Sequence, residues 1–142
     1  MSDQIWDKPV PLVTEDSRPY WDGLQRGRLV LQRCAACGKT RHYPRPMCDQ
    51  CHSMNSEWFT ARGTGTVHSW TIAWQAFHPG FKSEIPYTLV IVDLPEGVRV
   101  LARLQEPSSD GTPVPLRLGQ AVHIGFKPAA SGFSLPVVLT DD

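Results

Sequence analysis

All four cysteines of the chain stand inside eighteen residues as two Cys-x-x-Cys pairs, and this grouping constrains the fold more than any other feature. Cys34 pairs with Cys37 and Cys48 with Cys51, with ten residues between the pairs. Each such turn can direct both thiolates toward one metal ion, and Gly38 supplies the backbone freedom that the turn needs. Four thiolates complete the tetrahedral shell that structural zinc prefers. The spacing therefore predicts a short zinc ribbon with four cysteine ligands.

Three other uses of these cysteines have to be weighed against zinc. Disulfides require an oxidising compartment, and residues 1–7 lack the basic and apolar regions of a signal peptide. A redox Cys-x-x-Cys normally comes singly and opens a helix. Iron fits the same shell, and sequence separates it poorly from zinc. His42 and His52 stand close to the pairs, but four cysteines leave them no ligand position, so we expect surface or supporting roles. A closed shell has no position for substrate, which makes the metal structural.

The composition describes an ordinary globular protein. The chain has 142 residues, of which 41% are apolar and 20% charged, which suits one domain with a small appendage. Its longest apolar runs, such as residues 89–92, are far too short to span a bilayer. With no signal peptide, we expect a cytoplasmic protein without membrane association.

The net charge is zero but unevenly spread. Residues 25–62 carry seven bases and two acids, whereas residues 63–142 carry five bases and seven acids. A basic ribbon can contact the phosphates of a nucleic acid or of a nucleotide-like cofactor. A solvated surface on a metal module explains the same pattern equally well.

The N-terminal part reads as an arm followed by a short helix. Residues 1–15 are rich in proline but too apolar for a free tail, so we expect the arm to lie on its own domain or on a partner. Asp16 or Ser17 can cap a helix, Pro19 suits its first turn, and Gly27 suits the position after its end.

The rest of the chain reads as mainly β. Residues 29–33 form a strand that enters the first cysteine pair, and five further strands are predicted at 65–74, 87–94, 98–104, 121–127 and 135–140. Alternation along 65–74 places Val67 on one face and Trp70 on the other. Residues 105–120 read as a loop. The fold class is a short helix, a rubredoxin-like ribbon and a five-stranded OB-like barrel, divided as 1–28, 29–61 and 62–142.

These elements and several motifs resemble a known family, the zinc-ribbon/OB-fold proteins associated with acyl-CoA enzymes, long catalogued as a domain of unknown function. Besides the cysteine pairs, the matching motifs are Pro-Tyr-Trp-Asp-Gly-Leu at 19–24, Tyr-Pro-Arg-Pro at 43–46, Gly-x-Gly-x-Val at 63–67, Phe-His-Pro-Gly-Phe at 77–81, Pro-Tyr at 86–87 and Val-Asp-Leu-Pro-Glu-Gly-Val at 92–98. Pro95 departs from the polar turn residue expected there, and residues 105–115 have no strong motif.

The resemblance implies a non-catalytic accessory subunit. Members of the family look like obligate partners of thiolase-fold enzymes, namely thiolases, acyltransferases and aldolases. The subunit docks on the partner and helps form the pocket for coenzyme A or acyl-CoA, while the catalytic cysteine belongs to the partner. A hetero-oligomer with structural zinc is therefore expected, and whether the assembly acts as an enzyme depends on the partner.

The residues themselves agree with a binding role. The chain has no P-loop, nucleophile elbow or dinucleotide fingerprint. Asp93 and Glu96 stand at a hairpin tip, where carboxylates are usually solvated. An aromatic set is the tentative surface for partner or acyl-CoA contact: Trp70, Trp74, Phe77, His78 and Phe81. Core packing of that set is the competing interpretation. Five bases could meet coenzyme A phosphates: Arg62, Lys82, Arg99, Arg103 and Lys127.

Two alternatives from other classes remain. Zinc ribbons and OB barrels also bind nucleic acids, but the barrel segment has a net charge of minus two, which weakens this hypothesis. Electron transfer through iron held by the four thiolates is the third hypothesis.

Overall fold

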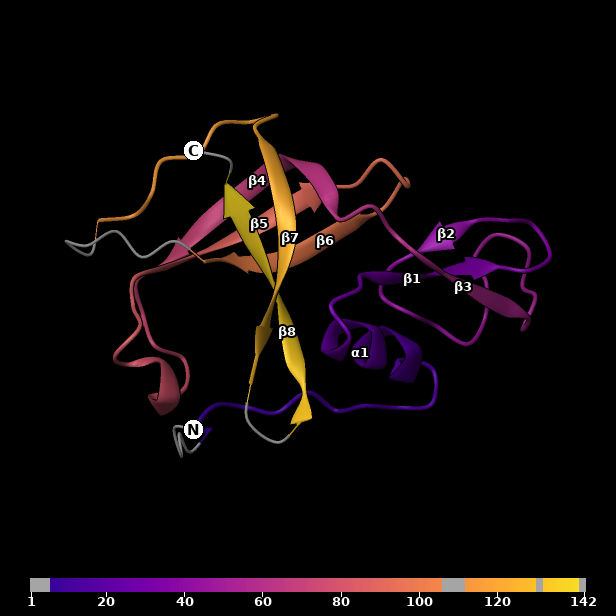
Figure 1. Ribbon diagram of the computed structural model, residues 1–142, viewed down its shortest axis with the longest axis horizontal. Helices are drawn as coiled ribbons and strands as arrows, with labels where there is room; N and C mark the ends of the chain where they lie inside the picture. The colour runs from indigo at the N-terminus through magenta and orange to yellow at the C-terminus, as the bar shows by residue number, and fades with distance from the viewer. Residues whose placement is uncertain (1–5, 106–111, 130–131, 141–142) are drawn as a thin grey trace.

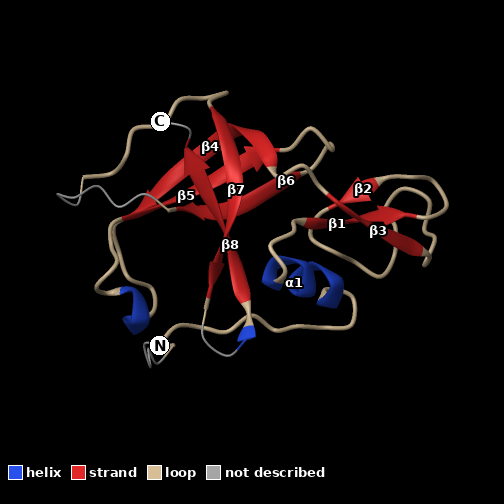
Figure 2. Cartoon of the chain, viewed as in Figure 1, coloured by secondary structure: helices blue, strands red, loops and turns tan. Residues whose placement is uncertain are grey.

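The computed structural model describes residues 6–105, 112–129 and 132–140, and Figure 1 shows a ribbon module beside a barrel. In chain order the elements are α1 (Arg18–Gln25), β1 (Val30–Cys34), β2 (Thr40–Arg41), β3 (Ser56–Thr60), β4 (Thr64–Ala73), the 3-10 helix η1 (Pro79–Phe81), β5 (Tyr87–Asp93), β6 (Arg99–Leu104), β7 (Ala121–Pro128) and β8 (Ser134–Thr140). Three strands form a small sheet in the order β2-β1-β3, and five close a barrel in the order β4-β5-β6-β8-β7 (Figure 2). The predicted mainly β fold class is confirmed.

Helix α1 lies between the ribbon and the barrel. It packs against β1 and β8, and its buried side chains are Tyr20 and Leu24. Gly27 follows its end with φ of 75°, as predicted for the residue after the helix. Ser17 occupies the capping position, but its hydroxyl bonds to Thr14 instead of the helix. A helix of eight residues depends on this packing, because so short a helix is marginal alone.

The barrel core is built from the inward faces of its strands. Val90, Val92 and Val100 are completely buried on the β5–β6 hairpin. The predicted hairpin is confirmed, since Leu94 N donates to Val98 O at 2.9 Å and Gly97 takes φ of 93° in the turn. Branched residues alternate inward along both strands, which closes one apolar interior.

The strict alternation predicted along β4 is wrong. Val67 pairs with Val92 and Trp70 with Val90, and the register shifts between Val67 and Ser69. Because Val90 and Val92 both face the interior, Val67 and Trp70 share one face instead of opposing each other. A β-bulge of this kind reverses the facing of every residue beyond it.

The N-terminal arm lies on its own chain. The Trp6 ring packs edge-on against Phe133 with 5.4 Å between centroids, and Lys8 bonds to Glu84. Of the predicted loop at 105–120, residues 106–111 lie outside the described residues. Within the described ranges, every helix is too short or too polar to cross a membrane.

Candidate functional site

The four cysteine sulfur atoms form one cluster. The Sγ atoms of Cys34, Cys37, Cys48 and Cys51 lie within 4.8 Å of one another. Cys34 Sγ is 3.5 Å from Cys51 Sγ, and Cys37 Sγ is 3.6 Å from Cys48 Sγ, so the cysteines are free of disulfides. Four sulfurs at a metal–sulfur distance of about 2.3 Å stand about 3.8 Å apart in a tetrahedron. The cluster therefore fits the metal shell that the spacing predicts.

Two equivalent turns position the sulfurs. In the first, Gly38 N donates to Cys34 O at 3.0 Å, and in the second His52 N donates to Cys48 O at 3.0 Å. Gly38 has φ of 81° and His52 has φ of 65°, so His52 takes in the second turn the left-handed position that glycine takes in the first. The sequence alone did not reveal this role of His52.

Backbone amides favour the thiolate state. Cys37 N donates to Cys34 Sγ at 3.4 Å, and this bond is the largest of several contacts that lower the pKa of Cys34 to about 6. Hydrogen bonds from the backbone amides of Cys51 and Gln50, the latter at 3.4 Å, also lower the pKa of Cys48. Lys39 joins the turns through a 2.8 Å ion pair with Asp49. The four cysteines suit zinc, which when bound would crosslink the two turns as a structural ion.

Of the surface and supporting roles that we expected for His42, its position in the structure fits the supporting one. Its ring packs between Tyr20 and Tyr43, with centroid distances of 5.0 and 4.1 Å. Burial lowers the pKa of His42 to about 4, so its imidazole is neutral at pH 7. Among the described residues, neither His42 nor His52 joins the metal-ligating group.

The aromatic set divides into exposed and anchored members. Phe77 is 82% exposed and Trp74 67% exposed, whereas Trp70 in β4 is 36% exposed. Phe81 is half-buried against Tyr87, with 5.6 Å between ring centroids, and His78 Nδ1 accepts a hydrogen bond from the Gly80 amide at 3.0 Å. Phe77 and Trp74 are therefore the most exposed members, His78 and Phe81 shape the loop, and Trp70 belongs to β4. Their contact with a partner or acyl-CoA stays a prediction.

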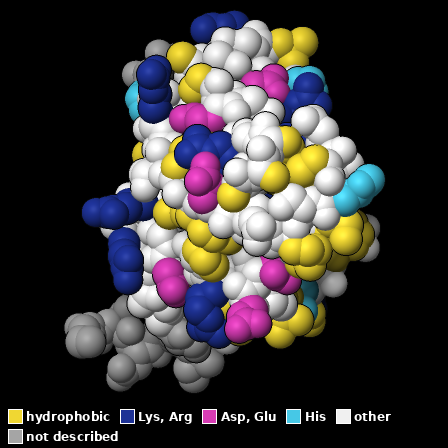
Figure 3. Space-filling view, turned by 90° about the vertical axis from the view of Figure 1, so that its right-hand side faces the viewer, with side chains coloured by type: hydrophobic (Ala, Val, Ile, Leu, Met, Phe, Trp, Pro, Cys, Tyr) yellow, Lys and Arg dark blue, Asp and Glu magenta, His cyan; other side chains and the backbone are white. Residues whose placement is uncertain are grey.

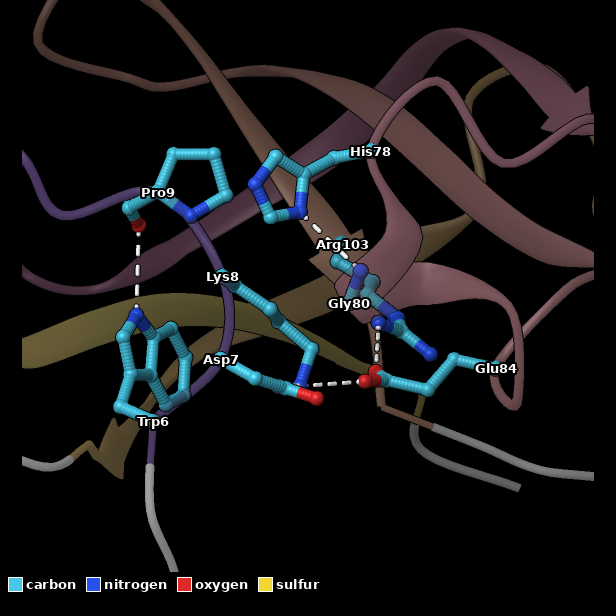
Figure 4. Close-up of polar contacts among 8 residues, drawn as sticks. All are labelled: Trp6, Asp7, Lys8, Pro9, His78, Gly80, Glu84 and Arg103. Atoms are coloured by element: carbon cyan, nitrogen blue, oxygen red, sulfur yellow. Dashed lines mark hydrogen bonds and ion pairs between the residues drawn. The ribbon is translucent and has the colours of Figure 1, made fainter.

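An ion cluster ties the arm to this loop and to the barrel (Figure 4). Glu84 accepts from Lys8 of the arm and from Arg103 of β6, each at 2.5 Å. Burial opposes ionisation, but these two bonds hold the pKa of the Glu84 carboxyl below its usual value. A Cβ on Gly80 would stand 2.3 Å from the Asp7 carbonyl oxygen, so only glycine permits this approach of arm and loop.

A groove of 1210 Å³ opens beneath the arm. Its apolar walls include Trp21, Phe81, Pro86 and Val137, and Arg103 adds a cation. Sequence periodicity gave no signal for it, because its walls come from the arm, α1, the η1 loop and the four strands β5, β6, β7 and β8.

The hairpin carboxylates are bonded to protein groups, and the Asp93 side chain is also 41% exposed to solvent. Asp93 accepts from Arg99 at 2.7 Å and lies 3.1 Å from His68 Nδ1, while Glu96 accepts from the Arg62 amide at 3.0 Å. These contacts brace the hairpin. Of the five candidate bases, Arg99 and Arg103 are therefore paired with acids, and Arg62, Lys82 and Lys127 lie exposed.

Comparisons with known proteins match both parts of the chain. Residues 21–56 match the family described as "ChsH2, rubredoxin-like zinc ribbon domain" and residues 58–127 match "ChsH2, C-terminal OB-fold domain". A "DUF35 domain-containing scaffold protein" of Pyrococcus furiosus is 35% identical over 74% of each chain.

Two further relatives carry names from acyl-CoA metabolism or aldol chemistry. A "Probable enoyl-CoA hydratase alpha subunit" of Thermomonospora curvata is 35% identical over 92% of this chain, which spans 39% of that relative's length. A solved chain titled "Ltp2-ChsH2(DUF35) aldolase" superposes with a TM-score of 0.79 at 33% identity, covering 94% of this chain and 100% of that one. The chain therefore belongs to the DUF35 family of ChsH2-type zinc-ribbon and OB-fold proteins.

Proposed function

We propose that this protein is a non-catalytic accessory subunit of a thiolase-fold acyl-CoA enzyme, a thiolase, acyltransferase or aldolase. One observation carries the proposal: over 94% of its length the chain superposes on the chain titled "Ltp2-ChsH2(DUF35) aldolase". The scaffold name of the Pyrococcus relative supports the same role. The subunit forms a hetero-oligomer with the enzyme, and structural zinc on Cys34, Cys37, Cys48 and Cys51 keeps its ribbon rigid.

The exposed aromatics are the proposed docking residues. Phe77 and Trp74 are large, apolar and solvent-exposed, on the segment that follows β4. Aromatic side chains of this kind supply much of the binding energy of protein interfaces when a partner covers them. His78 and Phe81 hold the segment in shape through their contacts with Gly80 and Tyr87.

The groove beneath the arm is the proposed contribution to the acyl-CoA site. Its apolar walls suit an acyl chain or the pantetheine arm of coenzyme A, and the partner supplies the catalytic cysteine. The chain's own carboxylates are engaged in ion pairs or amide contacts at Glu84, Asp93 and Glu96, which supports a binding role over a catalytic one.

Affinity purification from the native host, followed by mass spectrometry, tests the proposal. A thiolase-fold enzyme should be recovered in near-stoichiometric amount with the tagged wild-type protein. Phe77→Ser should reduce that recovery about tenfold or more without changing the melting temperature, because the ring is largely exposed. Leu118→Ser is the matched control, since Leu118 is 73% exposed on the turn before β7. Recovery of nucleic acid without an acyl-CoA enzyme would overturn the proposal in favour of a nucleic-acid-binding module.

A further inference from the structure

A second cleft separates the ribbon from the tip of the β5–β6 hairpin. It has a volume of 590 Å³, and in Figure 1 β2 and this hairpin tip lie on the same side of the molecule. Its charged lining residues are Lys39, Arg41, Arg45 and Arg99 with Asp49 and Asp93, an excess of two positive charges. Figure 3 shows this end of the molecule, where basic and acidic side chains stand side by side.

Both carboxylates of the cleft already have cationic partners. Asp49 accepts from Lys39 through both oxygens, at 2.9 and 2.8 Å, and Asp93 accepts from Arg99 at 2.7 Å. In the described part of the chain, the two remaining cations, Arg41 and Arg45, face no carboxylate within ion-pair distance. The excess charge of the cleft is therefore concentrated on these two guanidinium groups.

Arg41 is fixed in place with one guanidinium nitrogen unpaired among the described residues. Its side chain is only 7% exposed. Its Nε donates to Gln32 Oε1 at 2.6 Å and its Nη2 donates to the Arg45 carbonyl at 3.0 Å, both neutral acceptors. Its Nη1 is buried and has no hydrogen-bond partner among the described residues. Burying a guanidinium without an anion is costly, because its charge leaves water without a compensating partner.

His42, the next residue, also has buried nitrogen atoms without a hydrogen-bond partner among the described residues. These are both nitrogens of its ring. Buried polar atoms in folded proteins nearly always have partners, so three such atoms on adjacent residues beside one cleft point to a missing group.

We propose that this cleft binds a phosphate group of a small molecule. Arg41 Nη1 is its fixed donor, held by Gln32, and the exposed Arg45 side chain is the second cation. Guanidinium groups match the geometry of phosphate oxygens, and two of them balance a phosphate dianion. The phosphate can come from a nucleotide such as coenzyme A or from free inorganic phosphate. The site does not depend on the proposed subunit function.

Calorimetric titration of the zinc-loaded full chain tests this site, with pyrophosphate and coenzyme A as separate probes. Each titration is repeated by NMR, following the side-chain nitrogen signals of Arg41 and His42. We expect saturable binding that shifts those signals. Arg45→Gln should weaken it about tenfold, the effect of losing one charge-assisted hydrogen bond, while keeping the backbone carbonyl that Arg41 uses.

Arg28→Gln is the control, because Arg28 is an exposed base that does not line the cleft. Melting temperature and zinc content should match the wild type in both variants. Binding of both probes supports the site and indicates that its phosphate can belong to a nucleotide. Binding of pyrophosphate alone supports the site and indicates that its ligand is free phosphate. Absence of saturable binding, or equal weakening in Arg28→Gln and Arg45→Gln, would overturn the proposal. Neither result affects the affinity purification of a partner enzyme, so the subunit proposal is tested independently.

Discussion

The ribbon and the barrel of this protein reach a stable fold by different means. The ribbon has three short strands, of which β2 has two residues, and its centre is a cluster of four sulfur atoms. The barrel has five strands and a centre of branched aliphatic side chains such as Val90 and Val138, both completely buried. A module as small as the ribbon buries too little apolar surface to fold without help, so its stability should depend on metal, whereas the barrel's should depend on packing.

The two modules also bury different polar residues. Gln32 and Arg41, both almost fully buried, lie in the ribbon and bond to each other across β1 and β2. The barrel buries mainly valine, leucine and alanine, and its buried polar residues are the small, uncharged Thr88 and Ser134. A module crosslinked by metal tolerates polar side chains near its centre. Arg41 is such a side chain, and it lines the proposed phosphate cleft between the ribbon and the barrel.

Removing a cysteine ligand should have the largest effect. Cys34→Ala should abolish tight zinc binding, because the binding free energy of such sites, about 10–16 kcal/mol, is coupled to folding. Zinc content by atomic absorption and amide exchange of the ribbon should both change, while barrel amides stay protected. His52→Gly is the control, since His52 has φ of 65° and is not a ligand, so zinc should be retained. Full zinc content in Cys34→Ala would contradict the assignment.

A cavity in the barrel should produce the converse result. Leu104 is 5% exposed in the barrel core, so Leu104→Ala should lower the free energy of unfolding by about 2–4 kcal/mol. Zinc content should be unchanged. Denaturant titration with parallel zinc analysis measures both, and loss of zinc in this variant would mean that the two modules fold as one unit.

Acidification should act through His42, which lies between α1 and the ribbon. The unfolded imidazole binds a proton below its ordinary pKa of 6.5, whereas the folded one does so only near pH 4. The stability due to neutral His42 is therefore complete above pH 6.5 and lost as pH falls from 6.5 to 4, by about 2–3 kcal/mol. His42→Phe keeps the ring stack with Tyr20 and Tyr43 but cannot be protonated. Unfolding measured at pH 7 and pH 4.5 should show a steeper loss in the wild type, and parallel losses would refute this role.

Breaking the arm contact should have the smallest effect. Glu84→Gln removes the carboxylate that Lys8 and Arg103 share, and its partial burial suggests a loss of about 1–2 kcal/mol. Faster proteolysis of the arm should accompany the lower melting temperature. Glu57→Gln is the matched control, because Glu57 pairs with Arg33 at 53% exposure and should have little effect. Equal shifts in the two variants would show that the arm is not held by Glu84.

The sequence by itself determined the parts that depend on local patterns. Two cysteine pairs at fixed spacing defined the ribbon, because metal geometry requires both sulfurs of each turn to face one point. The end of α1 at Gly27 and the turn at Gly97 followed from the backbone conformations that glycine allows. Strands of the barrel followed from β-branched runs between turn residues, and family motifs along the chain identified the fold that joins these parts.

Only the tertiary structure decided which residues from distant segments meet. The bulge after Val67 reversed the facing of Trp70, because register is set by pairing with β5 and not by the sequence of β4 itself. Glu84 joined Lys8 to Arg103 across 76 and 19 residues of chain, and the unpaired guanidinium nitrogen of Arg41 became visible only when β1, β2 and the hairpin were assembled. Such contacts depend on how far chain segments approach in space, and no local periodicity records that distance.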